Sequence, residues 1–147
     1  MENKKYYQIE HILPHRYPFL FLDKIVAIEP GKKGVGVRNF TVNDFFFNSS
    51  TIVPSTLCQM LIIEALSQTA AVVSNSSEGS EDISSSKEGF IAGIDNFSFF
   101  QNPMPGDQLY LHVELLGHYG NLHKFNAWVI VDGKEVARGE LTFAIQQ

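Results

Sequence analysis

A single carboxylate, Glu64, interrupts the apolar run MLIIEAL, which extends from Met60 to Leu66. An ionised carboxylate in apolar surroundings is costly unless a hydrogen-bonding partner satisfies it or a reaction uses it. Ser67, Gln68 or water could satisfy Glu64, since Ser67 and Gln68 lie three and four residues further along the same helical face. The alternative is a carboxylate that faces a substrate and moves protons, and both interpretations stay open.

The other side chains that could do chemistry are one cysteine and five histidines. Cys58 lies near a predicted helix N-terminus, where the pKa of a thiol can be lowered, but no histidine partner is near it in the sequence. The histidines are expected to be structural or solvent-facing: His11, His15, His112, His118 and His123. The usual motifs for phosphate, dinucleotide and zinc binding are absent, so we expect no cofactor and no metal site.

A long helix and several strands must position these residues. Pro54 and Ser55 or Thr56 mark a helix start, and Leu57–Val73 follows without Gly or Pro and is apolar almost all round, which is typical of a buried helix. Apolar or alternating segments separated by turn signals predict these strands: Phe19–Ile28, Val35–Phe47, Phe90–Phe100, Gln108–Leu116, His123–Val131 and Glu135–Ile145. The turns EPGKKG and VDGK separate neighbouring strands. The order favours an α+β fold in which antiparallel strands wrap one central helix.

Size and charge restrict the class of protein. A chain of 147 residues fits a single domain, 1–147, with a mobile serine-rich loop near 74–88. The net charge of −5 argues against nucleic acid as a partner. The N-terminal sequence has no apolar signal core, and no run approaches the roughly 20 apolar residues of a membrane span. With a single cysteine, these features predict a soluble, cytoplasmic protein.

Several segments match one known family in order and spacing. They are ILPHRYPFLFLDKI (12–25), IEPGK (28–32), LIIEALSQTA (61–70), AGID (92–95), PGDQL (105–109), VELL (113–116) and VDG (131–133). Over nearly its whole length the chain resembles the β-hydroxyacyl-(acyl carrier protein) dehydratases of the FabZ type, which have the hotdog fold. The resemblance implies a curved antiparallel sheet around one long helix, and a homodimer or higher homo-oligomer.

The resemblance also implies a reaction and a set of residues. The family removes water from a (3R)-hydroxyacyl thioester on acyl carrier protein, using a histidine from a GHFP segment and a helix Glu from the other protomer. Glu64 matches that Glu, and Gln68 matches the Gln beside it. The histidine position is occupied by Ser50, in the segment NSSTI. A serine hydroxyl is a very poor general base near neutral pH, so the catalytic motif is incomplete.

The substrate-binding side of the motif is altered as well. The family's MPG, whose backbone N–H groups polarise the thioester carbonyl, falls on Leu57, Cys58 and Gln59. Phe97 and Phe99 could line an acyl tunnel or could belong to the core. The segments NFSFFQN (96–102) and GHYGN (117–121) hold no Lys or Arg, which weakens docking of an acidic carrier protein.

These departures leave several functions open. The first is an impaired or accessory dehydratase homologue that binds acyl-carrier-protein or acyl-CoA thioesters in fatty acid or polyketide-type synthesis, and that could form a heterodimer with a histidine-bearing homologue. The second is an active (3R)-hydroxyacyl-thioester dehydratase with a relocated base. A thioesterase that uses Glu64 alone is the third, and a structural subunit with a plugged tunnel is the fourth.

Overall fold

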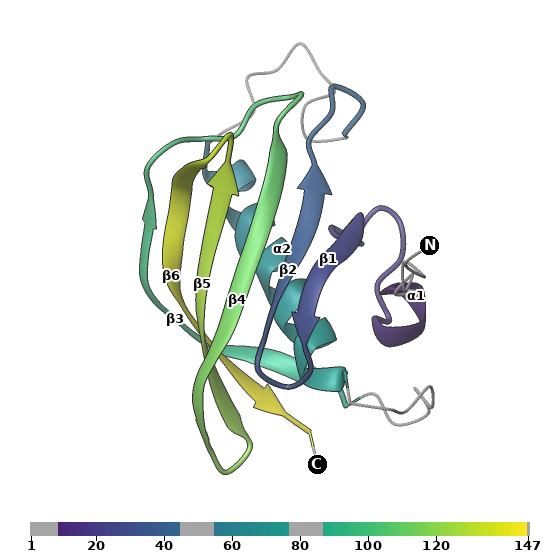
Figure 1. The fold of residues 1–147 in the computed structure, drawn as a ribbon, viewed down its shortest axis with the longest axis vertical. Helices are drawn as coiled ribbons and strands as arrows, with labels where there is room; N and C mark the ends of the chain where they lie inside the picture. The colour runs from purple at the N-terminus through teal and green to yellow at the C-terminus, as the bar shows by residue number, and fades with distance from the viewer. Residues whose placement is uncertain (1–8, 45–54, 77–86, 147) are drawn as a thin grey trace.

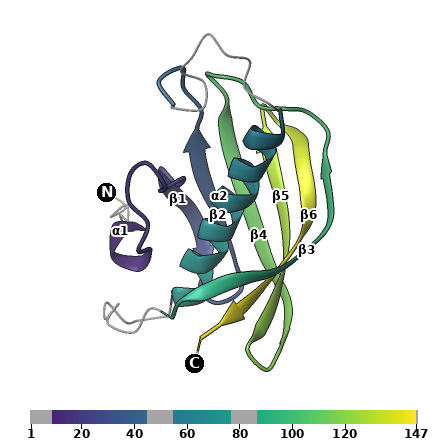
Figure 2. The ribbon, with the colours of Figure 1, turned by 180° about the vertical axis from the view of Figure 1, so that it is seen from behind.

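In the computed structural model, a curved six-stranded antiparallel sheet wraps one long helix (Figures 1 and 2). The structure describes residues 9–44, 55–76 and 87–146. The helices are α1 (Ile9–Ile12) and α2 (Ser55–Asn75). The strands are β1 (Lys24–Glu29), β2 (Lys33–Asn39), β3 (Gly89–Phe99), β4 (Gln108–Tyr119), β5 (Leu122–Val131) and β6 (Lys134–Ile145). Their order in the sheet is β1-β2-β4-β5-β6-β3, so the α+β prediction is confirmed.

The predicted turns lie where the sequence places them. β5 and β6 are joined by Asp132 and Gly133, whose φ angles of 49° and 74° are those of a two-residue hairpin turn. Gly31, with a φ of 72°, lies in the turn between β1 and β2. At both turns a residue that tolerates the left-handed region sets the register of the strands that follow.

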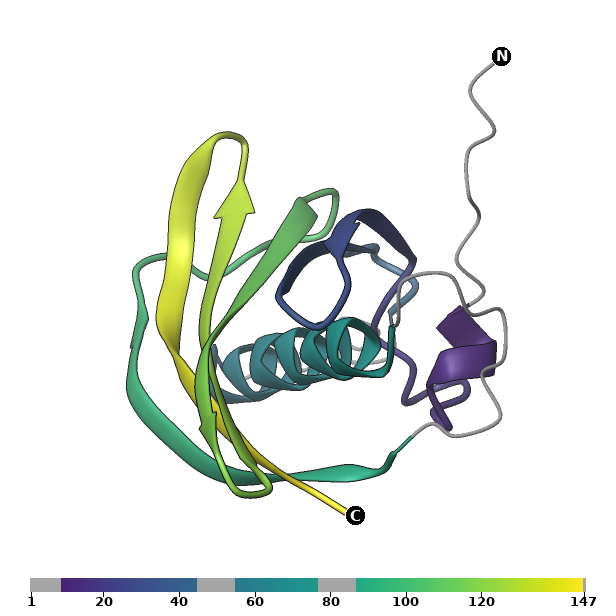
Figure 3. The ribbon, with the colours of Figure 1, turned by 60° about the horizontal axis from the view of Figure 1, so that its bottom comes forward.

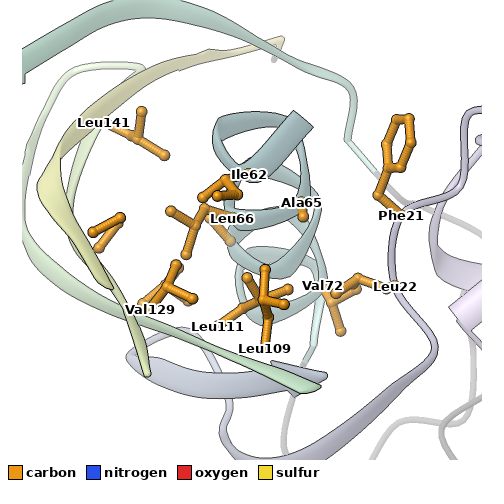
Figure 4. Packing of buried hydrophobic residues seen from close by; sticks show 14 of the residues in the cluster. Phe21, Leu22, Ile62, Ala65, Leu66, Val72, Leu109, Leu111, Val129 and Leu141 are labelled. Atoms are coloured by element: carbon orange, nitrogen blue, oxygen red, sulfur yellow. The ribbon is translucent and has the colours of Figure 1, made fainter. Parts of the chain in front are cut away.

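The core lies between α2 and the concave face of the sheet, as Figures 3 and 4 show. Ile62 and Leu66 are fully buried there and face Leu109, Leu111 and other strand residues. Two glycines of β2 let the helix approach closely. A Cβ on Gly36 would lie 2.8 Å from Thr69 Oγ1, and a Cβ on Gly34 would lie 2.7 Å from Val73 Cγ2.

Three expectations about the elements were wrong in detail. The first strand begins at Lys24 rather than Phe19, because the backbone around Phe19 and Phe21 bonds to a helix side chain instead of a neighbouring strand. The second strand ends at Asn39, and Phe45–Phe47 of its predicted range lie outside the described residues. The helix is not buried all round, since the side chain of Met60 is 63% exposed.

The strand order also differs from a simple succession. β3 pairs with β6, and β4 pairs with β2. β3 therefore lies at one edge of the sheet, and only one side of it is paired in the part of the chain that the structure describes. Strand order depends on long-range pairing, which the alternation within one strand does not encode.

The apolar helix is long enough to be compared with a membrane span. Leu57–Asn75 has a mean hydropathy of 1.4, so by length and composition alone this helix could cross a membrane. In this fold, however, it is the core helix that the sheet wraps (Figure 3). The serine-rich loop predicted near 74–88 overlaps the end of α2 at Ser74 and Asn75, and residues 77–86 lie outside the described residues.

Candidate functional site

The segment before β1 forms a strap, residues 13–23, that crosses α2 on the side away from the sheet (Figure 3). Arg16 fixes its first turn by donating hydrogen bonds to the carbonyl oxygens of Glu10, Leu13 and His15 at 2.8–2.9 Å. The Phe19 N–H donates back to the Arg16 carbonyl at 2.7 Å. These bonds hold the backbone of His15 in place at the start of the strap.

Gln68 ties the strap to the helix. Its Oε1 accepts a hydrogen bond from the Phe21 N–H at 2.8 Å, and its Nε2 donates to the Phe19 carbonyl at 2.8 Å. The same Nε2 donates to Glu64 Oε1 at 3.0 Å. The Gln68 side chain is 1% exposed, so each of these bonds satisfies a group that water reaches poorly. One buried amide therefore positions both the strap and the carboxylate.

Glu64 has a second neighbour, which sequence analysis missed. His15 Nε2 lies 3.5 Å from Glu64 Oε1, with the two side chains 32% and 38% exposed. His15 Nδ1 is buried and finds no hydrogen-bond partner among the described residues. The 49 positions that separate the two residues hide this contact in the sequence. The one available signal was that His15 belongs to the PHRYPF segment, and we expected it to be structural.

A groove of about 810 Å³ opens beside this pair, along the side of α2 from Glu64 to Asn75. His15 and Gln68 line one part of it with Glu64. Apolar side chains of β3 and β6, including Phe90, Ile91 and Phe143, line the rest. A carboxylate and an imidazole that meet at the edge of a partly apolar groove can move protons on a ligand with an apolar chain.

Cys58 is not an activated thiol. Burial raises its pKa to about 11, the opposite direction from the lowering expected near a helix N-terminus. Its side chain is 4% exposed, and its Sγ lies 3.9 Å from the Pro103 carbonyl oxygen. This environment disfavours the thiolate that a nucleophilic role would need. The neighbouring Gln59 makes a long contact, 3.5 Å, from Nε2 to Asn102 Oδ1. Substrate binding by Cys58 and Gln59 stays a prediction.

Phe97 and Phe99 stack on each other with ring centroids 5.6 Å apart, and both pack against the core. Phe97 lies directly over Gly139, where a Cβ would come within 2.1 Å of the ring. This placement accounts for both residues as parts of the core edge, and their role in lining an acyl tunnel stays a prediction. Ser50 lies outside the described residues, so its prediction stays open. Within residues 9–44, 55–76 and 87–146, no three His, Cys, Asp or Glu side chains cluster as metal ligands would.

Comparison with known proteins defines the class of protein. Residues 13–140 match the model of the FabA-like domain. The fold resembles that of the dehydratase heterocomplex ApeI:P from Xenorhabdus doucetiae, with a TM-score of 0.71, 13% identity and coverage of 95% of this chain and 91% of that one. The chain is thus an α+β hotdog-fold protein of the FabA-like class.

Sequence relatives narrow this class. A 3-hydroxyacyl-[acyl-carrier-protein] dehydratase FabZ of Exiguobacterium sibiricum is 42% identical over 139 residues, which is 95% of this chain and 96% of that protein. The FabZ of Bacillus thuringiensis (strain Al Hakam) is 41% identical over 138 residues, covering 94% of this chain and 93% of that protein. The chain therefore belongs to the FabZ-type dehydratase family, as the sequence motifs predicted.

Proposed function

We propose that this protein binds 3-hydroxyacyl thioesters, carried on acyl carrier protein or coenzyme A, and that alone it is an impaired dehydratase or an accessory subunit of one. The observation that carries the proposal is the Glu64–Gln68 pair at the edge of the groove. Glu64 would protonate the departing hydroxyl, and the Gln68 amide would hold the carboxylate. Impairment follows from Ser50, since losing a positioned acid–base group removes on the order of 10²–10⁴ in rate.

The open side of β3 supports an assembly with a second copy or a homologue. β3 is 11 residues long, and its apolar side chains Phe90, Ile91 and Ile94 are 41–58% exposed. A long apolar edge strand is a ready template for pairing with another chain. We propose a homodimer here, or a heterodimer in which a histidine-bearing FabZ-type partner completes a site containing Glu64. The protein would act in the cytoplasm, in fatty acid or polyketide-type synthesis.

A rate assay tests the activity. Purified protein is given (3R)-3-hydroxyacyl thioesters on carrier protein and on coenzyme A, and formation of the enoyl thioester and of free thiol is followed separately. We expect slow enoyl formation that falls at least 10²-fold in Glu64→Gln, because the amide cannot donate a carboxyl proton. Absence of both binding and turnover on either carrier would refute the proposal, and release of thiol alone would identify a thioesterase.

Mixing experiments test the accessory role. The chain is combined with an active FabZ-type dehydratase whose own helix Glu has been replaced by Gln, so that neither protein alone holds a complete family site. Recovery of turnover that requires Glu64 supports a mixed dimer. The matched control uses Glu64→Gln in the same mixture, and an unchanged rate with both forms rules out complementation.

A further inference from the structure

We propose that His15 is the proton acceptor that works with Glu64, in place of the histidine that position 50 lacks. This inference rests on the proposed function, because it assigns a residue to the same reaction. Its first basis is distance. His15 Nε2 lies 3.5 Å from Glu64 Oε1 within one chain, a separation that a small rotation of either side chain would close to a hydrogen bond. Catalytic hydrogen bonds are often this long before substrate binds.

Access is the second basis. His15 and Glu64 are about one-third exposed, and both line the groove beside α2. A substrate in the groove would therefore reach the Nε2 side of the imidazole and the Glu64 carboxylate together. His11, by contrast, lies exposed on α1 and does not line this groove. His118 and His123 line the groove too, but they stack on each other at a ring-centroid distance of 5.4 Å, and no ion pair joins either of them to Glu64 in the described residues.

The third basis is that the His15 backbone is held while its ring is not. Arg16 accounts for the backbone, through its bonds to the carbonyl oxygens of Leu13 and His15. The ring nitrogen Nδ1 has no hydrogen-bond partner among the described residues. An efficient base is usually oriented by a third group on its second nitrogen. A histidine without that group is poorly oriented for proton transfer, which agrees with an impaired enzyme.

The proposed step balances as follows. Neutral His15 Nε2 takes the proton from the carbon α to the thioester carbonyl, and the C–H electron pair becomes the new α–β double bond. The bond between the β carbon and the hydroxyl oxygen breaks, with its electron pair going to oxygen. Protonated Glu64 gives its proton to that oxygen, so water leaves. The imidazolium then returns its proton to the Glu64 carboxylate across the short gap between them, which restores both groups without any co-reactant.

Replacement and chemical rescue test this role. We expect His15→Ala to lower the rate of enoyl formation about 10²-fold or more, and added imidazole to restore part of it by filling the space that the ring leaves. The control, His11→Ala, should keep the wild-type rate and show no response to imidazole. If His15→Ala unfolds, His15→Gln serves instead, because its amide can bond to Glu64 but cannot accept the proton, and this variant should fold and be equally slow.

A second variant separates this inference from the proposed function. Ser50→His puts an imidazole back at the family position, and we expect it to raise the rate and to make the reaction tolerant of His15→Ala. The inference is overturned if His15→Ala keeps the wild-type rate, if imidazole fails to rescue a folded His15→Ala, or if Ser50→His turns over substrate while the wild type does not. Failure of both wild type and Ser50→His to turn over any thioester would overturn this inference and the impaired-enzyme form of the proposed function, while the accessory form is decided by thioester binding and by the mixing experiment.

Discussion

The two faces of α2 are held by different interactions. The face toward the sheet is apolar or tightly fitted, and its residues Ile62, Leu66, Thr69 and Val73 are fully buried. The face toward the strap holds Gln68 and Glu64, whose surroundings are defined by hydrogen bonds rather than by shape. On the first face a change in side-chain volume costs stability, and on the second the loss of a hydrogen bond does.

The comparison shows why the position of Glu64 depends on the strap. Gln68 is at once a structural link between strap and helix and the support of Glu64. Any change that frees Glu64 would therefore also loosen the strap.

The largest effect is expected from Gln68→Leu, which removes the hydrogen bonds between α2 and the strap. The variant keeps the volume but leaves the Phe21 N–H, the Phe19 carbonyl and Glu64 without their partner. The unsatisfied buried Phe21 N–H costs about 1–3 kcal/mol, and the partly buried Phe19 carbonyl and Glu64 add less, so we expect a loss of roughly 2–4 kcal/mol in the free energy of unfolding. Urea unfolding checks this, and Ser67→Ala is the control, because Ser67 lies on the same helix and its hydroxyl donates a hydrogen bond to the Ile63 carbonyl. Equal losses in the two variants would contradict the assigned role of Gln68.

Gly36→Ala disturbs the packing between α2 and the sheet by adding volume, without removing a hydrogen-bonding group. The new methyl group would meet Thr69 Oγ1 and Leu22 Cδ2 at 2.8 Å, so the helix or the strand must shift. Overpacking of this kind costs about 1–3 kcal/mol. The matched control is Gly117→Ala, on β4, where nothing lies within 4 Å of the added carbon. Thermal unfolding of the two variants should separate them clearly, and similar melting temperatures would show that the close approach of α2 to β2 is not required.

Cys58 lies one turn before Ile62 on the sheet face of α2. The reactivity of its thiol therefore tests whether this face is buried at the start of the helix. Because burial raises the pKa of its thiol to about 11, only about one thiol in several thousand is ionised near pH 7.5. We therefore expect alkylation of the folded protein to be much slower than that of the urea-unfolded chain. Rapid labelling of the native protein would place Cys58 on an accessible surface instead.

Features encoded in local sequence could be predicted, whereas contacts between distant residues could not. The long helix, the hairpin at Asp132–Gly133 and the family were predictable because each is written in local pattern or motif. Phe19–Asp23 of the strap was predicted to belong to the first strand, because this segment is rich in apolar residues, while its real partner is a side chain nearly 50 residues away. The contact of His15 with Glu64 was missed for the same reason, since neither residue carries a local sign of the other.

The smallest expected effect concerns acid stability at the far end of the groove, where β4 and β5 bring His118 and His123 together. Burial first, and then the charges of His118 and Lys87, lower the pKa of His123. The unfolded chain therefore takes up this proton before the folded one does, so this contribution to stability is complete above about pH 6.5 and is lost as the pH falls toward the lower folded value. We expect the melting temperature to drop less between pH 7.5 and 5.5 in His123→Asn than in the wild type.

His112 also has a pKa lowered by burial, but it stacks on Trp128 outside this groove. His112→Asn should therefore reduce the drop in melting temperature independently, and the two effects should add. A steeper acid loss in His123→Asn would mean that the folded state binds this proton more tightly, and the groove would then stabilise the imidazolium rather than exclude it.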